Sequence, residues 1–167
     1  MKQLLLIRHA KSSWADPGQT DFDRPLNDRG KRDAPLMATR ILDRNFRVQH
    51  VYSSAAKRAL KTSKLLMEIW NLQQDSLSIF PDLYLAPPAE MLNLITTAPD
   101  EISSLALVAH NPGITEFINS LTNNRVDDLP TCGMVAFQID TASWSTFRDA
   151  SKEWLFIEYP KRDPSLG

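Results

Sequence analysis

The chain has one cysteine among its 167 residues and no long apolar run. The lone Cys132 excludes an internal disulfide framework and is typical of a reducing compartment. No base is evident beside it, so we expect a small buried side chain rather than a nucleophile. The longest apolar runs, residues 4–7 and 105–109, are too short to span a bilayer, and the N-terminal MKQLLLIRH lacks a signal-peptide core. We therefore expect a cytoplasmic protein without a membrane segment.

An excess of charge of one sign is also absent. Nineteen basic residues against twenty acidic residues leave a formal net charge of −1. This is a poor electrostatic footprint for general binding to nucleic acids or anionic membranes, so neither is expected as a partner. The chain also lacks repeats, low-complexity tracts and linker-like stretches. These observations predict a single domain over residues 1–167.

Short apolar runs alternate with segments of helical periodicity. Continuous runs such as LLLI and LALVA are typical of parallel strands that are covered on both faces. The predicted strands cover residues 2–8, 50–53, 76–80, 104–109, 134–140 and 153–159. The last two strands are expected to form a β-hairpin, with at least one antiparallel strand near the end of the sheet.

Helices are predicted between the first strands. They run from a cap at Asn27 or Asp28 to about residue 44, from a cap at Ser54 to about residue 71, over a short stretch after Pro88, and from Asn111-Pro112 to about residue 123. The predicted inner faces carry Ala34, Met37, Ile41 and Leu42 in the first helix and Leu60, Leu65, Leu66 and Ile69 in the second. This order predicts an α/β class, a three-layer α/β/α sandwich with a mostly parallel mixed sheet of about six strands.

Cationic residues and histidines stand where predicted parallel strands end. Arg8 and His9 end the first strand, His110 ends the fourth, and Arg58 lies early in the helix after the second. The nearest acidic residue to Arg8 is Asp16. Because ligands of open α/β sheets bind outside the carboxyl ends of the strands, we expect these side chains to gather around one ligand.

The chemistry of this set favours an anion. A single histidine at a strand end is usually a satisfied polar residue, but two at equivalent ends, one beside an arginine, favour a site. His50 begins its strand and is therefore assigned to the opposite edge, with a structural role. Guanidinium groups suit bidentate contact with phosphate, whereas zinc needs three or four protein ligands that no HxH, HExxH or carboxylate-rich cluster supplies. The residues predict a phosphoryl site without a metal or other cofactor.

Four ordered motifs carry a resemblance to a known family. RHAKSSW (8–14), DFDRPLNDRG (21–30), SSAAKRALKT (53–62) and VAHNPG (108–113) resemble the signature of the histidine phosphatase (phosphoglycerate mutase-like) superfamily. The RPLN element and the lack of a long lid insertion are most similar to the small SixA-type phosphohistidine phosphatases. The resemblance extends from Lys2 to the last predicted strand and implies a phosphoglycerate mutase-like fold.

The resemblance also implies roles for seven residues. His9 is the expected nucleophile, and His110 is the expected hydrogen-bond partner of the phosphoryl oxygens. Arg8 and Arg58 are expected to clamp those oxygens. Arg24 resembles an additional phosphate contact, and Ser12 and Asn27 match positions that line the pocket. Cationic neighbours should lower the pKa of His9 and keep its ring unprotonated near neutral pH.

The sequence departs from the superfamily in one respect. Many members carry a carboxylic acid after the third strand that protonates an alkoxide leaving group, but here the region reads FPDLYLAPPAEML. Asp82, Glu90, Asp21 and Asp23 are nearby, yet each suits a surface, capping or arginine-pairing role. A missing acid matters less for phosphohistidine, because imidazole leaves easily.

Three functions remain open at this point. The leading one is a metal-independent phosphatase that forms a covalent phosphohistidine intermediate and acts on a phosphate-bearing partner, a phosphohistidine protein. The second is a phosphatase of small phosphate monoesters. The third, of a different class, is a non-catalytic phosphoprotein-binding module.

Overall fold

One mixed sheet forms the centre of the molecule. The computed structural model describes residues 1–165, and within this range the sheet has six strands in the order β3-β2-β4-β1-β5-β6. The strands are β1 (Lys2–Arg8), β2 (His50–Ser54), β3 (Leu77–Phe80), β4 (Ser104–Ala109), β5 (Met134–Ile139) and β6 (Lys152–Glu158). Each predicted strand differs from the observed one by at most one residue at either end.

The pairing confirms the mostly parallel sheet and the C-terminal hairpin. β1 pairs in parallel with β4, and β2 pairs in parallel with both β3 and β4. β5 is antiparallel to β1 and to β6. The carboxyl ends of β1, β2 and β4 therefore lie next to one another at one edge of the sheet.

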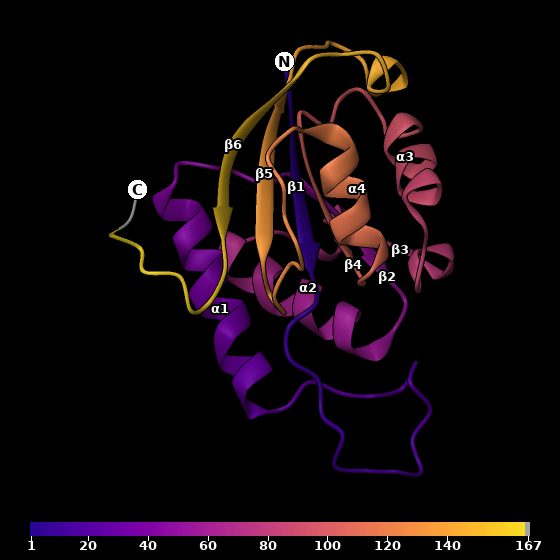
Figure 1. The fold of residues 1–167 in the computed structure, drawn as a ribbon, viewed down its shortest axis with the longest axis vertical. Coiled ribbons are helices and arrows are strands. Elements are labelled where there is room, and N and C mark those ends of the chain that lie inside the picture. The colour runs from indigo at the N-terminus through magenta and orange to yellow at the C-terminus, as the bar shows by residue number, and fades with distance from the viewer. Residues whose placement is uncertain (166–167) are drawn as a thin grey trace.

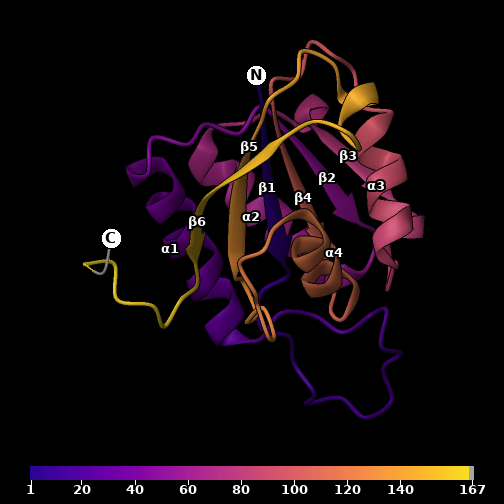
Figure 2. The ribbon, with the colours of Figure 1, turned by 45° about the horizontal axis from the view of Figure 1, so that its top comes forward.

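Helices cover both faces of this sheet, which confirms the three-layer α/β/α sandwich (Figures 1 and 2). The helices are α1 (Asp28–Asp43) and α2 (Lys57–Trp70) on one face, and α3 (Pro88–Thr96) and α4 (Gly113–Leu121) on the other. Side chains of β1 alternate between the two layers. Leu4 and Leu6 pack in the core under α3 and α4, and Leu5 and Ile7 pack in the core under α1 and α2. The strand that leads into the predicted nucleophile, His9, is thus held from both sides.

Helix α1 begins as the sequence predicts. The Oδ1 atom of Asn27 accepts a hydrogen bond from the backbone N–H of Gly30, so Asn27 is the N-cap. Gly30 is required by close packing, because a Cβ atom there would lie 2.2 Å from the carbonyl oxygen of Lys11. The first turn of α1 is therefore pressed against the backbone just after β1.

Helix α2 differs from the prediction in its start and in its buried face. Ala56 is the N-cap, while Ser54 belongs to β2 and its Oγ accepts a hydrogen bond from the Ala56 N–H. The buried face of α2 contains Arg58, Ala59, Thr62, Ser63, Leu66, Met67 and Trp70. Of the predicted apolar stripe only Leu66 is fully buried. Hydrogen-bonded polar residues such as Thr62 occupy core positions here, and hydrophobicity alone therefore gave the wrong face.

Helix α4 begins after the predicted position. Pro112, in a cis peptide bond with Asn111, is the N-cap residue, and the helix starts at Gly113. The Asn111 side chain does not cap the helix; its Nδ2 donates to Asp128 Oδ1 and to the Leu129 carbonyl.

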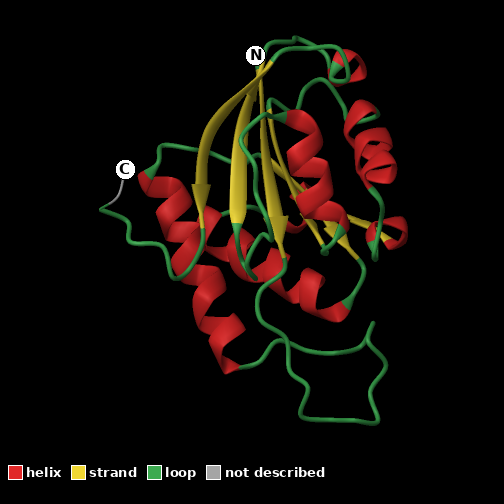
Figure 3. Cartoon of the chain, in the orientation of Figure 1, coloured by secondary structure: helices red, strands yellow, loops and turns green. Residues whose placement is uncertain are grey.

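The loop between β1 and α1 extends beyond the edge of the sheet where the parallel strands end (Figures 1 and 3). This segment and the strand ends together form the surroundings of the candidate site. No helix in residues 1–165 is both long enough and apolar enough to cross a membrane.

Candidate active site

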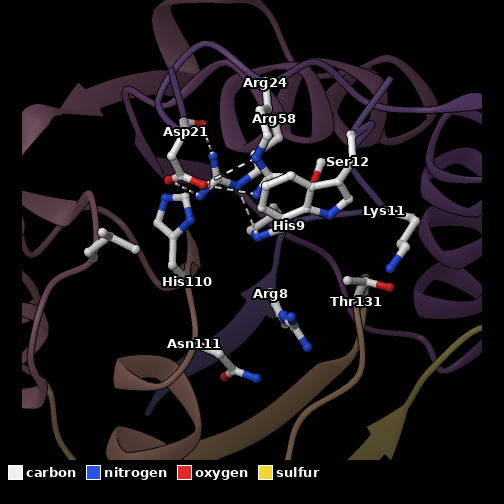
Figure 4. Close-up of a pocket in the computed structure, with 12 residues that line it drawn as sticks. Arg8, His9, Lys11, Ser12, Asp21, Arg24, Arg58, His110, Asn111 and Thr131 are labelled. Carbon is white, nitrogen blue, oxygen red and sulfur yellow. Dashed lines mark hydrogen bonds and ion pairs between the residues drawn. The ribbon is translucent and has the colours of Figure 1, made fainter. Parts of the chain in front are cut away.

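A cavity of about 350 Å³ opens at the carboxyl edge of the parallel strands. Its lining contains six of the seven predicted site residues: Arg8, His9, Ser12, Arg24, Arg58 and His110 (Figure 4). Residues far apart in sequence converge there as the strand order requires. Two walls can be distinguished by their origin. The strand wall consists of Arg8, His9 and His110 at the strand ends, with Arg58 from the first turn of α2. The loop wall consists of Ser12, Trp14, Asp21 and Arg24 from the segment between β1 and α1.

The ring of His9 is held in one tautomer. Arg58 donates from Nε to His9 Nε2 at 3.3 Å. Because a guanidinium can only donate, Nε2 must carry the lone pair, and Nδ1–H then donates to the Ala10 carbonyl at 2.8 Å. The nitrogen that faces the arginine is therefore the unprotonated one.

Burial and nearby cations keep this ring neutral. His9 is 6% exposed. Burial, followed by the positive charges of Arg58, Arg8 and Arg24, lowers the pKa of His9 to about 3, against the opposing hydrogen bond to Ala10. The predicted lowering by cationic neighbours is present, but desolvation is its larger cause.

Backbone contacts fix the chain on both sides of His9. The His9 N–H donates to the Ala109 carbonyl at 3.2 Å, and the Cys132 N–H donates to the carbonyls of Arg8 and His9. The Ala10 N–H donates to Thr62 Oγ1, which in turn donates to the Arg58 carbonyl. The same threonine therefore ties the residue after the histidine to the helix turn that carries Arg58.

His110 lies beside His9, with their ring centroids 5.1 Å apart. Ser54 Oγ accepts from Ala56 and lies 2.7 Å from His110 Nε2, so its own proton is free to be donated to that nitrogen. Nδ1 of His110 is buried and has no hydrogen-bond partner among the described residues. Burial, then His9 and Arg58, lowers the pKa of His110 to about 3. A neutral ring with a proton on Nδ1 can donate to a phosphoryl oxygen.

Asp21 stands within the arginine cluster. Arg58 donates to the Asp21 carboxylate at 3.0 Å and to its carbonyl at 2.6 Å, and Arg24 donates to the carboxylate at 3.0 Å. A hydrogen bond from Tyr84, together with those from both arginines, lowers the pKa of Asp21 to about 2. The carboxylate therefore stays ionised. The sequence predicts arginine pairing as one role of Asp21 but does not place this residue in the site.

Arg24 is oriented by further contacts. Its Nη1 donates to Ser12 Oγ, and its guanidinium carbon lies 3.6 Å from the centre of the Trp14 ring. Trp14 is 72% exposed and had no predicted role. An exposed tryptophan stacked on a buried arginine is a site feature that the RHAKSSW motif alone did not reveal.

Arg8 lies on another part of the wall, near Asn111 and Thr131 in the view of Figure 4. Its Nη1 donates to the Leu129 carbonyl at 2.8 Å, while its buried Nε has no partner among the described residues. That N–H group is therefore unsatisfied within residues 1–165 and is shielded from solvent.

Asn27 is the predicted site residue that the structure places outside the cavity lining. Its side chain caps α1 instead. His50 lies at the other end of its strand, where Nε2 is 2.8 Å from Ser78 Oγ, in agreement with its structural assignment. The other acidic candidates, Asp23, Asp82 and Glu90, do not line the cavity. Within residues 1–165 no group of three or more His, Cys, Asp and Glu side chains could hold a metal ion.

Comparisons with known proteins indicate the family of the chain. A family model described as histidine phosphatase superfamily (branch 1) matches residues 4–82. An uncharacterised chloroplastic protein of Arabidopsis thaliana is 31% identical over 152 residues, which cover 86% of this chain and 69% of the relative.

Solved structures extend the likeness to the whole fold. A protein of Agrobacterium tumefaciens assigned as a phosphohistidine phosphatase, SixA, matches with a TM-score of 0.81 and 26% identity, covering 95% of this chain and 98% of that one. A protein histidine phosphatase SixA in complex with tungstate matches with a TM-score of 0.80, covering 95% and 97% of the two chains. At 18% identity, the second match shows the fold alone.

Proposed function

The chain belongs to the histidine phosphatase superfamily, and we propose that it is a metal-independent phosphatase acting on phosphohistidine in proteins through a covalent phosphohistidine at His9. The observation that carries the proposal is the state of His9. Its Nε2 atom is unprotonated, faces a guanidinium and lines an open cavity. A neutral imidazole in such a place is a nucleophile for phosphorus.

In the first step, Nε2 of His9 attacks the phosphorus atom of the substrate. A phosphorus–nitrogen bond forms at His9 while the bond to the substrate imidazole breaks. That imidazole leaves as a neutral ring because its other nitrogen takes a proton from water. In the second step, water attacks the phosphorus of phospho-His9 and releases inorganic phosphate, which regenerates the neutral ring.

Positive charge and hydrogen-bond donors around His9 would stabilise the transferring group. Arg58 and Arg8 supply guanidinium N–H groups on the strand wall, and Arg24 supplies them on the loop wall. The Nδ1 proton of His110 completes the set. Phosphoryl transfer depends mainly on such positioning and charge stabilisation, and fixed donors provide both without reorganisation.

The ionisation of Asp21 favours a phosphorus–nitrogen substrate over a phosphate ester. Asp21 is the carboxylate that lines the cavity among the described residues, and its pKa is lowered to about 2. An ionised carboxylate paired with two arginines cannot give a proton to an alkoxide. Imidazole is the better leaving group, so its transfer depends less on an acid.

A comparative assay tests the proposal against small-ester hydrolysis. We expect kcat/KM to be at least tenfold higher for a phosphohistidine peptide than for phosphoserine and sugar phosphates, measured as phosphate release. A preference for the esters would support the small-monoester phosphatase instead.

A chemical trap separates catalysis from binding alone. Rapid quench during turnover should give an acid-labile, base-stable phosphate on the wild-type protein and none on a His9→Ala variant. Tight binding of the phosphorylated peptide without phosphate release would identify a phosphoprotein-binding module. Activity should persist in EDTA, and its loss on chelation would contradict metal independence.

A further inference from the structure

A second hollow lies outside the catalytic cavity, where the segment before α1 meets α2. Its volume is about 400 Å³, and its apolar lining consists of Pro25, Leu26 and Leu60. Leu60 was expected in the core from its apolar character, but the buried face of α2 is turned away from it. An apolar residue has thus been left on a surface that the catalytic site does not use.

Four lysines complete the lining of this hollow, which we call the lysine groove: Lys31 from α1, and Lys57, Lys61 and Lys64 from α2. All four are exposed. Together with Leu60, the α2 lysines stand at positions i, i+3, i+4 and i+7, which is one face of a helix. Among the described residues no ion pair includes any of the four. The groove therefore concentrates uncompensated positive charge on a chain whose formal net charge is −1.

The lysine groove and the catalytic cavity are neighbours along two segments of the chain. Arg24 lines the cavity, and Pro25 follows it in the groove. In the same way, Lys57 lines the groove and Arg58 lines the cavity. A macromolecule that places a phosphoryl group against Arg24 and Arg58 would bring its adjacent surface to the groove.

We propose that the lysine groove is the docking site for an acidic, leucine-bearing segment that flanks the phosphorylated residue of a protein substrate. The inference rests on the proposed function and adds the character of the substrate's surface. Carboxylates would meet the four lysines, and apolar side chains would cover the half-buried Pro25 and Leu60. Such a complementary contact steers encounter and selects partners more than it adds raw affinity.

The apolar lining argues for a protein segment rather than another polyanion. A nucleic-acid backbone would meet the lysines but leave Pro25 and Leu60 without a matching surface, and the net charge of the chain is a poor footprint for such binding. Nucleic acid and an anionic bilayer are therefore competing occupants that the test must exclude.

Kinetics on two matched peptides test the groove. The probes are phosphohistidine peptides whose flanks contain leucine with glutamate, or leucine with lysine in place of every glutamate. For the wild-type chain we expect KM to be about tenfold lower for the acidic peptide, and this preference should shrink at high salt. The double variant Lys61→Glu/Lys64→Glu should lose the preference while its kcat on phosphoimidazole, a small substrate, stays unchanged.

A matched control places the same charge change elsewhere. Arg148 and Lys161 are exposed and lie outside both the cavity and the groove. The variant Arg148→Glu/Lys161→Glu should keep the wild-type preference. If both double variants lose it equally, net charge rather than the groove is responsible, and the proposal is wrong.

Direct binding keeps this test independent of catalysis. Fluorescence anisotropy of the unphosphorylated acidic peptide should show salt-dependent binding that is weakened about tenfold by Lys61→Glu/Lys64→Glu and several-fold by Leu60→Gln. Such binding without hydrolysis of any phosphohistidine probe would retain the groove and reject the proposed function. Equal binding of both peptides, or groove-dependent binding only of single-stranded DNA or of phosphatidylserine vesicles, would overturn the docking proposal.

Discussion

The strand wall and the loop wall face the same cavity but are built differently. His9, Arg58 and His110 on the strand wall are at most 6% exposed, and backbone hydrogen bonds fix the chain around His9. On the loop wall, Trp14 is 72% exposed, and Arg24, although only 7% exposed, is held by side chains: the Asp21 ion pair, the Ser12 hydroxyl and the Trp14 ring. On the proposed function, we expect the strand wall to perform the chemistry and the loop wall to affect which anion binds.

Removal of the His9 imidazole should cause the largest loss of activity. His9→Ala is expected to lower kcat by a factor of about 10⁴ or more, because no other described side chain of the cavity offers an unprotonated ring nitrogen positioned against Arg58. Steady-state phosphate release would measure the loss. His50→Ala is the matched control and should keep wild-type activity. A His9→Ala variant that turns over at the wild-type rate while its melting temperature is preserved contradicts the assignment.

Loss of the buried arginine should have the next largest effect. Arg58→Gln is expected to reduce kcat by a factor of about 10²–10³, since a fixed cationic donor is removed from the transferring group. Single-turnover kinetics would show whether the phosphorylation step is the one slowed. A change confined to KM would show that Arg58 contributes to binding only, and would contradict the expected difference between the two walls.

The equivalent change on the loop wall should be milder. Arg24→Gln is expected to reduce kcat/KM about tenfold, mainly through KM, because Arg24 contacts Ser12 and Trp14, whereas the hydrogen bond to the His9 ring comes from Arg58. Initial rates over a range of substrate concentrations would separate the two parameters. A loss as large as that of Arg58→Gln would show that both walls contribute equally to the chemistry.

Neutralisation of the Asp21 carboxylate should strengthen the binding of phosphate rather than weaken it. Asp21 is ionised above about pH 2 and competes with a phosphoryl group for the same guanidinium donors. Asp21→Asn is therefore expected to lower the inhibition constant of inorganic phosphate about threefold. Asp23→Asn, a change outside the cavity, serves as the control. Weaker phosphate inhibition in Asp21→Asn would show that the carboxylate mainly orients the arginines.

The smallest change in the site itself is expected near neutral pH, where the strand-wall rings should keep their protonation state. Because the pKa values of His9 and His110 are lowered to about 3, their imidazole resonances should not titrate between about pH 5 and pH 8. In the unfolded chain both would titrate near 6.5 and bind protons first. The free energy of unfolding should therefore fall as pH decreases from about 6.5 toward 3. Nitrogen-15 NMR and urea titrations would measure the two effects, and a ring that titrates near 6.5 in the folded protein would contradict the first.

The sequence predicted the strand wall better than the loop wall for a physical reason. Continuous apolar runs located β1 and β4 within one residue, so Arg8, His9 and His110 could be placed at one edge. The loop wall depends on how residues 9–27 fold back over the cavity. No periodicity encodes that path, and Trp14 and Asp21 were therefore missed as site residues.

The buried face of α2 is another feature that the sequence pattern did not predict. In α1 the apolar period matched the buried side, but α2 buries Thr62 and Ser63, whose hydroxyls bond to backbone and to Ser53. Polar groups that are satisfied in the core are invisible to a hydrophobicity pattern. Asn27 is predicted both as the cap of α1 and as a pocket residue. The structure shows the cap: its side chain accepts a hydrogen bond from Gly30 and does not line the cavity.

Cys132 gives the strand wall a chemical reporter. Its buried side chain has a pKa raised by desolvation, so the folded protein presents a thiol that oxidants and alkylating reagents cannot reach. Its N–H donates to the carbonyls of Arg8 and His9, so a local opening that breaks these bonds and exposes the thiol would also free the backbone at His9. The rate of thiol modification in the native state would therefore report how often the chain opens locally at the end of β1.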